Sequence, residues 1–202
     1  MMQSELAPHT ARNGQPILEV LRSEFAALGS VLEIGSGNGQ HATMLAREMP
    51  NLVWQTSDRP QNLPVIRQWL QDAAVPQVLA PLALDVLSDA CPGETYDAVF
   101  SANTAHIMSK AAVEKMFDLV ATVLRTGGRF CLYGPFRRNG EFNSGSNANF
   151  DRALRAEEGD MGIRELEQLH AYAAAGGLQH IGLYAMPTNN LIVVWQRTEG
   201  DA

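Results

Sequence analysis

The chain has 202 residues, of which 46% are hydrophobic and 18% charged, and its formal net charge is −7. This length suits one domain, 1–202, with a substantial core, and the composition excludes a disordered chain. Scattered positive residues disfavour a nucleic-acid partner, and no apolar run is long enough to span a bilayer, so a small-molecule ligand fits best. Without a secretory signal pattern or a disulfide framework, we expect a cytoplasmic protein. We expect it to be a monomer or a homodimer.

Helix-like and strand-like segments alternate along the sequence. An N-terminal helical cap, 1–29, contains a helix that is predicted to begin at Pro16. Apolar spacing then predicts, in order, strand 30–34, helix 41–48, strand 52–56, helix 63–73, strand 82–84, strand 96–102, helix 111–124, strand 129–134, helix 163–175 and strands 178–185 and 191–197. Gly127 and Gly128 are predicted to end helix 111–124.

A polar segment rich in Gly, Asn and Ser, 137–151, follows strand 129–134. It is long for a connection within a compact domain, and long connections are often lids over a binding site. The segment is therefore a candidate lid loop, with a merely flexible loop as the alternative.

The order of these segments predicts an α/β fold. Strands that alternate with helices favour a parallel sheet covered by helices on both faces. The last two strands are joined by a short turn, which requires an antiparallel pair. We therefore expect a mostly parallel sheet with an antiparallel C-terminal strand.

Three glycines follow the first strand in the run Gly35-Ser36-Gly37-Asn38-Gly39. Glycines let a ligand approach the main chain, and the carboxyl end of a parallel strand is where ligands bind. A tight turn without a ligand would need only one of them. Neither the longer glycine spacing of a dinucleotide site nor the Gly-Lys-Ser/Thr of a P-loop is present, which disfavours a nicotinamide-dependent oxidoreductase.

Carboxylates follow the next two strands. Asp58 comes about 20 residues after the glycines, where an acid can accept hydrogen bonds from ribose hydroxyls. Asp85 follows the third strand, where it could accept a hydrogen bond from an adenine amine. Each alone could cap a turn, but together with Glu33 they indicate an acidic site for a cationic ligand that carries a nucleoside.

The run Glu33 to Gly39 resembles the first motif of class I S-adenosylmethionine-dependent methyltransferases, and Asp58, Asp85 and 97–106 fall where later motifs of that family fall. The resemblance implies a Rossmann-like sheet of seven strands in the order 3-2-1-4-5-7-6, with S-adenosylmethionine as cofactor and S-adenosylhomocysteine as product. A narrower resemblance links the chain to a small methyltransferase-like family of bacteria and animals that has no assigned substrate. It rests on 11–13, 39–42, 54–58, 132–136, 143–147 and 186–191.

The resemblance also implies the residues that contact the cofactor. They are Arg12, Asn13, Glu33, Gly35, Ser36, Gly37, Asn38, Gly39, His41, Asp58, Asp85, Val86 and Asn103. Arg12 could pair with the cofactor carboxylate, although its alternative is a solvated surface arginine. His41 is expected either to contact the cofactor or to make a structural hydrogen bond.

The acceptor side is less defined by the sequence. His106 follows the fourth strand and is the candidate base, with a capping or packing histidine as the alternative. The candidate substrate pocket comprises Tyr133, Phe136, Asn143, Asn147 and Asn190, of which the aromatic residues could instead be core. We expect methyl transfer to oxygen or nitrogen of a small molecule without a metal. The alternatives are a cofactor-binding protein without catalysis and a protein methyltransferase.

Overall fold

Seven strands form the central sheet of the computed structural model, which describes residues 8–199. They are β1 (Ser30–Ile34), β2 (Val53–Asp58), β3 (Val78–Ala83), β4 (Tyr96–Ala102), β5 (Leu124–Gly134), β9 (Leu178–Met186) and β10 (Asn190–Arg197). Their order is β3-β2-β1-β4-β5-β10-β9, and β10 runs antiparallel to both neighbours while the other pairs are parallel. Numbered within the sheet, this is the expected order 3-2-1-4-5-7-6, so the predicted fold is confirmed.

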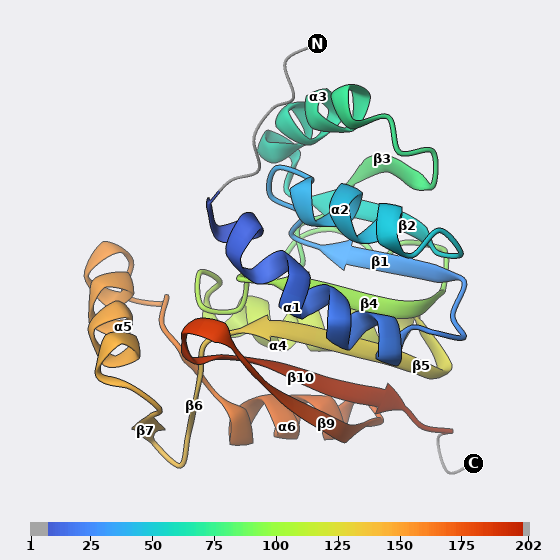
Figure 1. Ribbon diagram of the computed structural model, residues 1–202. Helices are drawn as coiled ribbons and strands as arrows, with labels where there is room; N and C mark the ends of the chain where they lie inside the picture. The colour runs from blue at the N-terminus through green and yellow to red at the C-terminus, as the bar shows by residue number, and fades with distance from the viewer. Residues whose placement is uncertain (1–7, 200–202) are drawn as a thin grey trace.

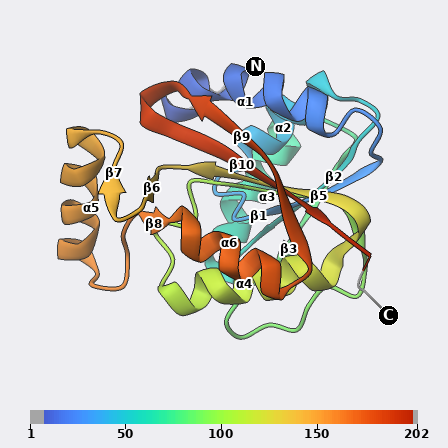
Figure 2. The same ribbon diagram turned by 90° about the horizontal axis from the view of Figure 1, so that it is seen from below.

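Helices cover both faces of the sheet (Figures 1 and 2). α1 (Pro8–Glu24), α2 (Gln40–Glu48) and α3 (Leu63–Ala73) pack on one face, with the short helix η1 (Pro60–Asn62) before α3. α4 (Lys110–Val123) and α6 (Leu166–Ala175) pack on the other face. The parallel strands end at one edge of the sheet, which is the edge toward which the β1 arrow points in Figure 1.

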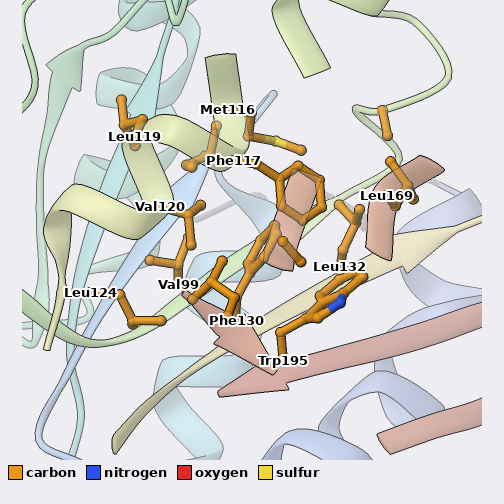
Figure 3. Close-up of a cluster of buried hydrophobic side chains, with 14 of the residues drawn as sticks. Val99, Met116, Phe117, Leu119, Val120, Leu124, Phe130, Leu132, Leu169 and Trp195 are labelled. Carbon is orange, nitrogen blue, oxygen red and sulfur yellow. The ribbon is translucent and has the colours of Figure 1, made fainter. Parts of the chain in front are cut away.

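Phe117, Phe130 and Trp195 pack together among aliphatic side chains in the core under α4 and α6 (Figure 3). The ring of Phe117 lies 5.4 Å from that of Phe130 and 5.3 Å from that of Trp195, both edge-on, and the Phe130 and Trp195 rings stack at 5.5 Å. Aromatic contacts of this kind add roughly 0.5–1.5 kcal/mol each to the burial of apolar area. They fix α4, and therefore the segment between β4 and α4, against the sheet.

The first helix is longer than the sequence predicted. α1 begins at Pro8, not at Pro16, and continues through Pro16. Proline cannot donate the backbone hydrogen bond of a helix interior, but Ile17 and Leu21 bury their side chains completely against the sheet. This burial outweighs the missing bond.

Gly127 and Gly128 do not end α4, contrary to the prediction. The helix ends at Val123, and Leu124 enters β5 directly with extended dihedral angles. Gly128 is needed for a different reason, because a Cβ there would lie 2.7 Å from the carbonyl oxygen of Asp97 in the neighbouring strand.

The predicted lid loop, 137–151, is not a loop. It contains most of β6 (Phe136–Arg138), β7 (Glu141–Phe142) and the first half of α5 (Gly145–Glu157). β8 (Arg164–Glu165) pairs with β6 and precedes α6, so the helix predicted from 163 begins at Leu166. The short helix η2 (Pro187–Asn189) joins β9 to β10, and α5 stands apart from the sheet in both ribbon views.

Candidate functional site

A cavity of about 720 Å³ lies at the carboxyl ends of β1, β2 and β4 and is closed by the segments that follow β3 and β4. A cavity of this size is typical of sites for small molecules and cofactors. The predicted cofactor residues that line it are Gly35, Ser36, Gly37, Asn38, His41, Asp58, Asp85, Val86 and Asn103. The fold therefore brings nine of the thirteen predicted cofactor residues to one cavity.

The loop after β1 is held to the end of β2 by backbone hydrogen bonds. The amides of Gly35 and Ser36 both donate to the carbonyl of Ser57, at 3.0 and 2.9 Å. Gly35 and Gly37 have φ angles of +74° and +61°, a region that residues with a Cβ rarely occupy. The glycines are thus required by the path of the loop. Gly37 also faces open space, with no atom within 4 Å of the position that a Cβ would occupy.

Asp58, the last residue of the neighbouring strand β2, is hydrogen-bonded to this loop. Its Oδ2 accepts a hydrogen bond from the Gly37 amide at 2.7 Å. Its Oδ1 accepts from the Arg59 amide at 2.8 Å and from the Asn62 side chain at 2.7 Å. A carboxylate has about four acceptor positions, so Oδ2 can accept one further hydrogen bond from a ligand in the cavity.

Asp85 caps its own turn with one oxygen only. Oδ1 accepts from the Leu87 amide at 3.0 Å, whereas Oδ2 makes no hydrogen bond within residues 8–199. Val86, next in the chain, lines the cavity and also packs against the core beneath α4. A polar acceptor and an apolar wall therefore lie together at this end of the cavity.

Asn103 has a left-handed backbone with φ of +59°, and its amide donates to the carbonyl of Tyr133 at 2.9 Å. Asn103 lines the cavity, and its side chain has no hydrogen-bond partner in the described part of the chain. Unusual backbone conformations in ordered structure cluster at functional sites. Asn103 therefore combines a fixed backbone at the cavity with an unpaired side-chain amide.

Glu33 does not line the cavity, although it lies beside the glycine loop. It is 2% exposed, and its Oε2 accepts from Ser36 Oγ at 2.9 Å and from Trp54 Nε1 at 3.2 Å. Burial raises the pKa of Glu33 to about 7, and the charge of Asp58 adds to the rise although the two hydrogen bonds oppose it. Glu33 therefore supports the glycine loop through its hydrogen bond with Ser36.

The other predicted cofactor residues outside the cavity are Gly39, Arg12 and Asn13. Gly39 packs against α3, where its Cβ would lie 3.4 Å from Ile66. Asn13 is buried in α1, and its Oδ1 lies 3.0 Å from Nε2 of His41, which does line the cavity. Arg12 is exposed one residue earlier on the same helix.

His106 is buried but lies outside the cavity-lining set. Its ring contacts Phe150 of α5 edge-on at 5.3 Å and makes no hydrogen bond within residues 8–199. Burial, and then the charge of Arg164, lower the pKa of His106 to about 4. The imidazole is therefore neutral at pH 7 and is a weaker base than an ordinary histidine.

The predicted substrate residues also lie outside the main cavity. Tyr133 and Phe136 are 1% and 2% exposed and belong to the core. Asn190 donates to Tyr133 Oη at 2.9 Å. Asn143 and Asn147 both donate to the carbonyl of Asn189, at 2.9 and 3.1 Å, and so tie α5 to the turn between β9 and β10. Phe136 and Asn143 line a second cavity of about 340 Å³.

Other residues that line the cavity were not predicted from the sequence. They are Ile34, Arg59, Asn62, Leu84, Leu87, Ala102, Thr104, Ile107, Met108, Ser109, Ala112 and Glu158. Asn62 had a usable signal, since an amide four residues after Asp58 can reach its carboxylate. Glu158 had none, because it comes from the end of α5, far along the chain. Three carboxylates and one guanidinium line the cavity, so it favours a cationic ligand.

Within residues 8–199, no group of three or more side chains is arranged to hold a metal ion. Of the helices that the structure describes, none combines the length and apolar character needed to cross a bilayer.

A family model described as a protein of unknown function (DUF938) matches residues 4–197. Among solved structures, an O-methyltransferase family protein from Burkholderia thailandensis is similar with a TM-score of 0.81 and 18% identity over 93% of this chain and 57% of that chain. An O-methyltransferase family 2 protein from Planctomyces limnophilus, in complex with apigenin, has a TM-score of 0.74 and 14% identity over 92% and 62% of the two chains. Human N-acetylserotonin methyltransferase, in complex with SAM, has a TM-score of 0.74 and 13% identity over 92% and 55%.

These similarities establish a Rossmann-like methyltransferase fold. The chain spans between 55% and 62% of the length of the three proteins. Apigenin and SAM are ligands of two of those solved proteins.

Proposed function

We propose that this chain, which belongs to the DUF938 family of proteins of unknown function, binds S-adenosylmethionine and transfers its methyl group to oxygen or nitrogen of a small molecule. When bound, this cofactor supplies an electrophilic methyl group on a positively charged sulfur. One observation carries the proposal: the glycine loop, Asp58, Asp85 and Asn103 line one cavity at the carboxyl ends of the strands.

The residues present fit an adenosyl group. Asp58 Oδ2 has acceptor capacity for a ribose hydroxyl, and Asp85 Oδ2 is a free acceptor for an adenine amine. Val86 and Met108, which both line the cavity, offer apolar surfaces for the adenine ring. The glycine loop leaves room beside Gly37 for the methionine part of the ligand.

The excess of carboxylates around the cavity suits a cationic sulfonium better than a phosphorylated ligand. Asn103 would face the methyl donor with its unpaired amide. Arg12, Asn13 and His41 would form the rim on the side of α1, and Glu33 would act through Ser36 rather than by direct contact.

We further propose that α5 and the β6–β7 hairpin cover the acceptor, with α1 as the opposite cap. α5 stands beyond the carboxyl ends of the strands in both ribbon views and reaches His106 through Phe150. Reactants held in alignment react far faster than free ones, and excluding water strengthens the electrostatic contacts that hold them. In this arrangement Asn143, Asn147 and Asn190 hold the cover instead of binding the acceptor directly.

A second candidate is a cofactor-binding protein without catalysis. It is favoured by the position of His106, which lies outside the lining of the cavity and has a pKa of about 4. A general base works best with a pKa near the working pH. A methyl acceptor that is already deprotonated would need no base, so the two candidates differ in turnover and not in cofactor binding.

The proposal is tested in two steps. The melting temperature of the protein is first followed with S-adenosylmethionine, S-adenosylhomocysteine and NAD. A ligand at 100 times its Kd should stabilise the fold by about 2.7 kcal/mol, and only the adenosyl sulfur compounds should do so. Cofactor with a labelled methyl group is then supplied with a metabolite extract. A labelled small molecule supports the enzyme, binding without any labelled product supports the second candidate, and no response to either adenosyl compound rejects both.

A further inference from the structure

A buried guanidinium holds the segment that forms one wall of the main cavity. Arg164, in β8, is only 5% exposed. Its Nε donates to the carbonyl of Ala105 at 2.9 Å, and its Nη2 donates to the carbonyls of Met108 and, at 2.8 Å, Asp160. Beside it the amide of Gly162 donates to the carbonyl of His106 at 2.9 Å.

The segment held in this way shapes the cavity. Ile107 and Met108 line it, and the amides of both residues donate to the carbonyl of Thr104, at 3.0 and 3.1 Å. Asp85 and Val86, from the segment after β3, line the same cavity. The position of the wall therefore depends on a residue that does not itself line the cavity.

A charged side chain at the buried position of Arg164 indicates a role other than packing. A buried cation costs several kcal/mol unless its hydrogen bonds compensate. The ion pairs of the described chain do not include Arg164, and its partners are neutral carbonyls. A rigid planar fork of donors can hold several carbonyls at fixed positions, which an apolar side chain cannot do.

The same segment is attached to α5. Asp151 of α5 accepts from the Ile163 amide with Oδ1 and from Arg155 Nε with Oδ2, both at 2.7 Å. The carboxylate thus joins α5 to the residue that precedes Arg164. The wall of the cavity and the helix beyond it are held as one unit.

We propose that Arg164 is a positioning residue that holds 105–108 in the shape that binds the adenosyl ligand. This inference rests on the proposed function of the cavity. It predicts that loss of the guanidinium loosens the turn at 105–108 and weakens ligand binding, although Arg164 does not line the cavity.

The test compares Arg164→Met with Arg129→Met in the full chain. Arg129 also donates to a backbone carbonyl, that of Glu24, and pairs with its carboxylate, but it joins β5 to the end of α1 and lines neither cavity. Affinity for S-adenosylhomocysteine is measured by calorimetry below the melting point of both variants. Amide exchange at Ile107 and Met108 is measured without ligand by NMR.

For Arg164→Met we expect Kd to rise about tenfold or more, which corresponds to the loss of one charged hydrogen bond. We also expect faster exchange at both amides. Arg129→Met should lower the melting temperature but leave Kd within about twofold of wild type. Arg164→Lys, which keeps the charge with fewer reachable carbonyls, should give an intermediate Kd, and it replaces the methionine variant if that variant does not fold.

Wild-type affinity and wild-type exchange in the Arg164 variants would overturn the inference. An equal rise in Kd for Arg129→Met would also overturn it, because the effect would then follow stability alone. If the wild-type protein fails to bind S-adenosylhomocysteine, the proposed function falls. In that case unchanged exchange at Ile107 and Met108 would reject the role of Arg164 in holding the wall, and faster exchange would support it.

Discussion

Gly35 lies directly against Thr104. A Cβ on Gly35 would stand 2.5 Å from Cγ2 of Thr104, inside the contact distance of two methyl groups. The hydroxyl of Ser101 donates to the carbonyl of Ile34 at 2.7 Å, so Thr104 must be the donor in its 2.6 Å contact with Ser101. The ends of β1 and β4 are therefore locked together beneath the glycine loop.

The first prediction concerns Gly35→Ala. A left-handed backbone with a side chain costs roughly 1–2 kcal/mol, and overpacking against Thr104 costs roughly 1–3 kcal/mol more. Gly37→Ala is the matched control, because Gly37 is also left-handed but faces open space; it should cost only the backbone part, roughly 1–2 kcal/mol. Urea unfolding measures both. Adding Thr104→Ser, which removes Cγ2 and keeps the hydroxyl, should recover only the overpacking part, and equal costs for the two alanines would contradict this account.

The second prediction concerns the pH dependence of stability set by Glu33. Its pKa is about 7 in the fold and near 4.5 in the unfolded chain, so the folded protein binds the proton more tightly. This contribution is fully present below about pH 4.5, and up to about 3 kcal/mol of it is lost as pH rises through 7. Glu33→Gln imitates the protonated form. Its stability relative to wild type should therefore grow between pH 5 and 7 and stay level above, as measured by urea unfolding; a constant difference would contradict the raised pKa.

The third prediction concerns His106, whose pKa is lowered to about 4 by burial and by Arg164. NMR titration should show a neutral imidazole down to about this pH, and Arg164→Met should raise the pKa of His106. The neutral form contributes stability above pH 6.5, the pKa of an unfolded histidine, and this contribution is lost as pH falls toward 4. A wild-type pKa near 6.5 would remove this argument against His106 as the general base.

The fourth prediction concerns the attachment of α5. Asn147 donates to Oδ1 of Asn143 at 2.7 Å and to the carbonyl of Asn189 at 3.1 Å. Asn147→Ala should speed amide exchange in α5 by about tenfold, equivalent to losing one hydrogen bond, with little change in the main sheet. Asn149→Ala, on the exposed side of the same helix, is the control. Equal exchange in the two variants would show that the asparagines do not hold α5.

Much of the central sheet followed from the sequence. Helix 63–73 and strands 30–34 and 96–102 have the predicted bounds. These segments bury regular apolar patterns, so local spacing and tertiary packing agree. The antiparallel end of the sheet followed from the short link between its last two strands.

The region beyond the sheet was harder to predict because its polar composition hid its structure. Asn139 and Gly140 have φ angles of +52° and +77° and form the tight turn between β6 and β7. Asn-Gly is a strong hairpin signal, but the strands that it joins are only two and three residues long. Ser144 caps α5 through the Asn147 amide at 3.1 Å, a role that its polar neighbours concealed.

The candidate site likewise has one part that could be predicted from the sequence and one part that could not. Its cofactor half is local, since Gly35, Asp58 and Asp85 each end or follow a strand, and parallel strands bring their carboxyl ends to one edge. The turn at 105–108 is hydrogen-bonded to Arg164, which comes 56 and 59 positions after Met108 and Ala105 in the chain. No pattern in the local sequence predicts such a long-range contact. Tyr133 and Phe136 show the opposite difficulty, because composition does not distinguish aromatic residues near a site from aromatic residues of the core.

The central claim is that Asp58 and the glycine loop bind an adenosyl ligand, and calorimetric titration with S-adenosylhomocysteine tests it most directly. Wild-type protein and Asp118→Ala, an exposed carboxylate paired with Lys115 on α4, should bind one equivalent with similar Kd. Asp58→Ala should bind at least about tenfold more weakly, because a charged acceptor of a ligand hydroxyl is worth roughly 1.5–3 kcal/mol. Folded wild-type protein that gives no saturable heat, or Asp58→Ala that binds as tightly as Asp118→Ala, would contradict the claim.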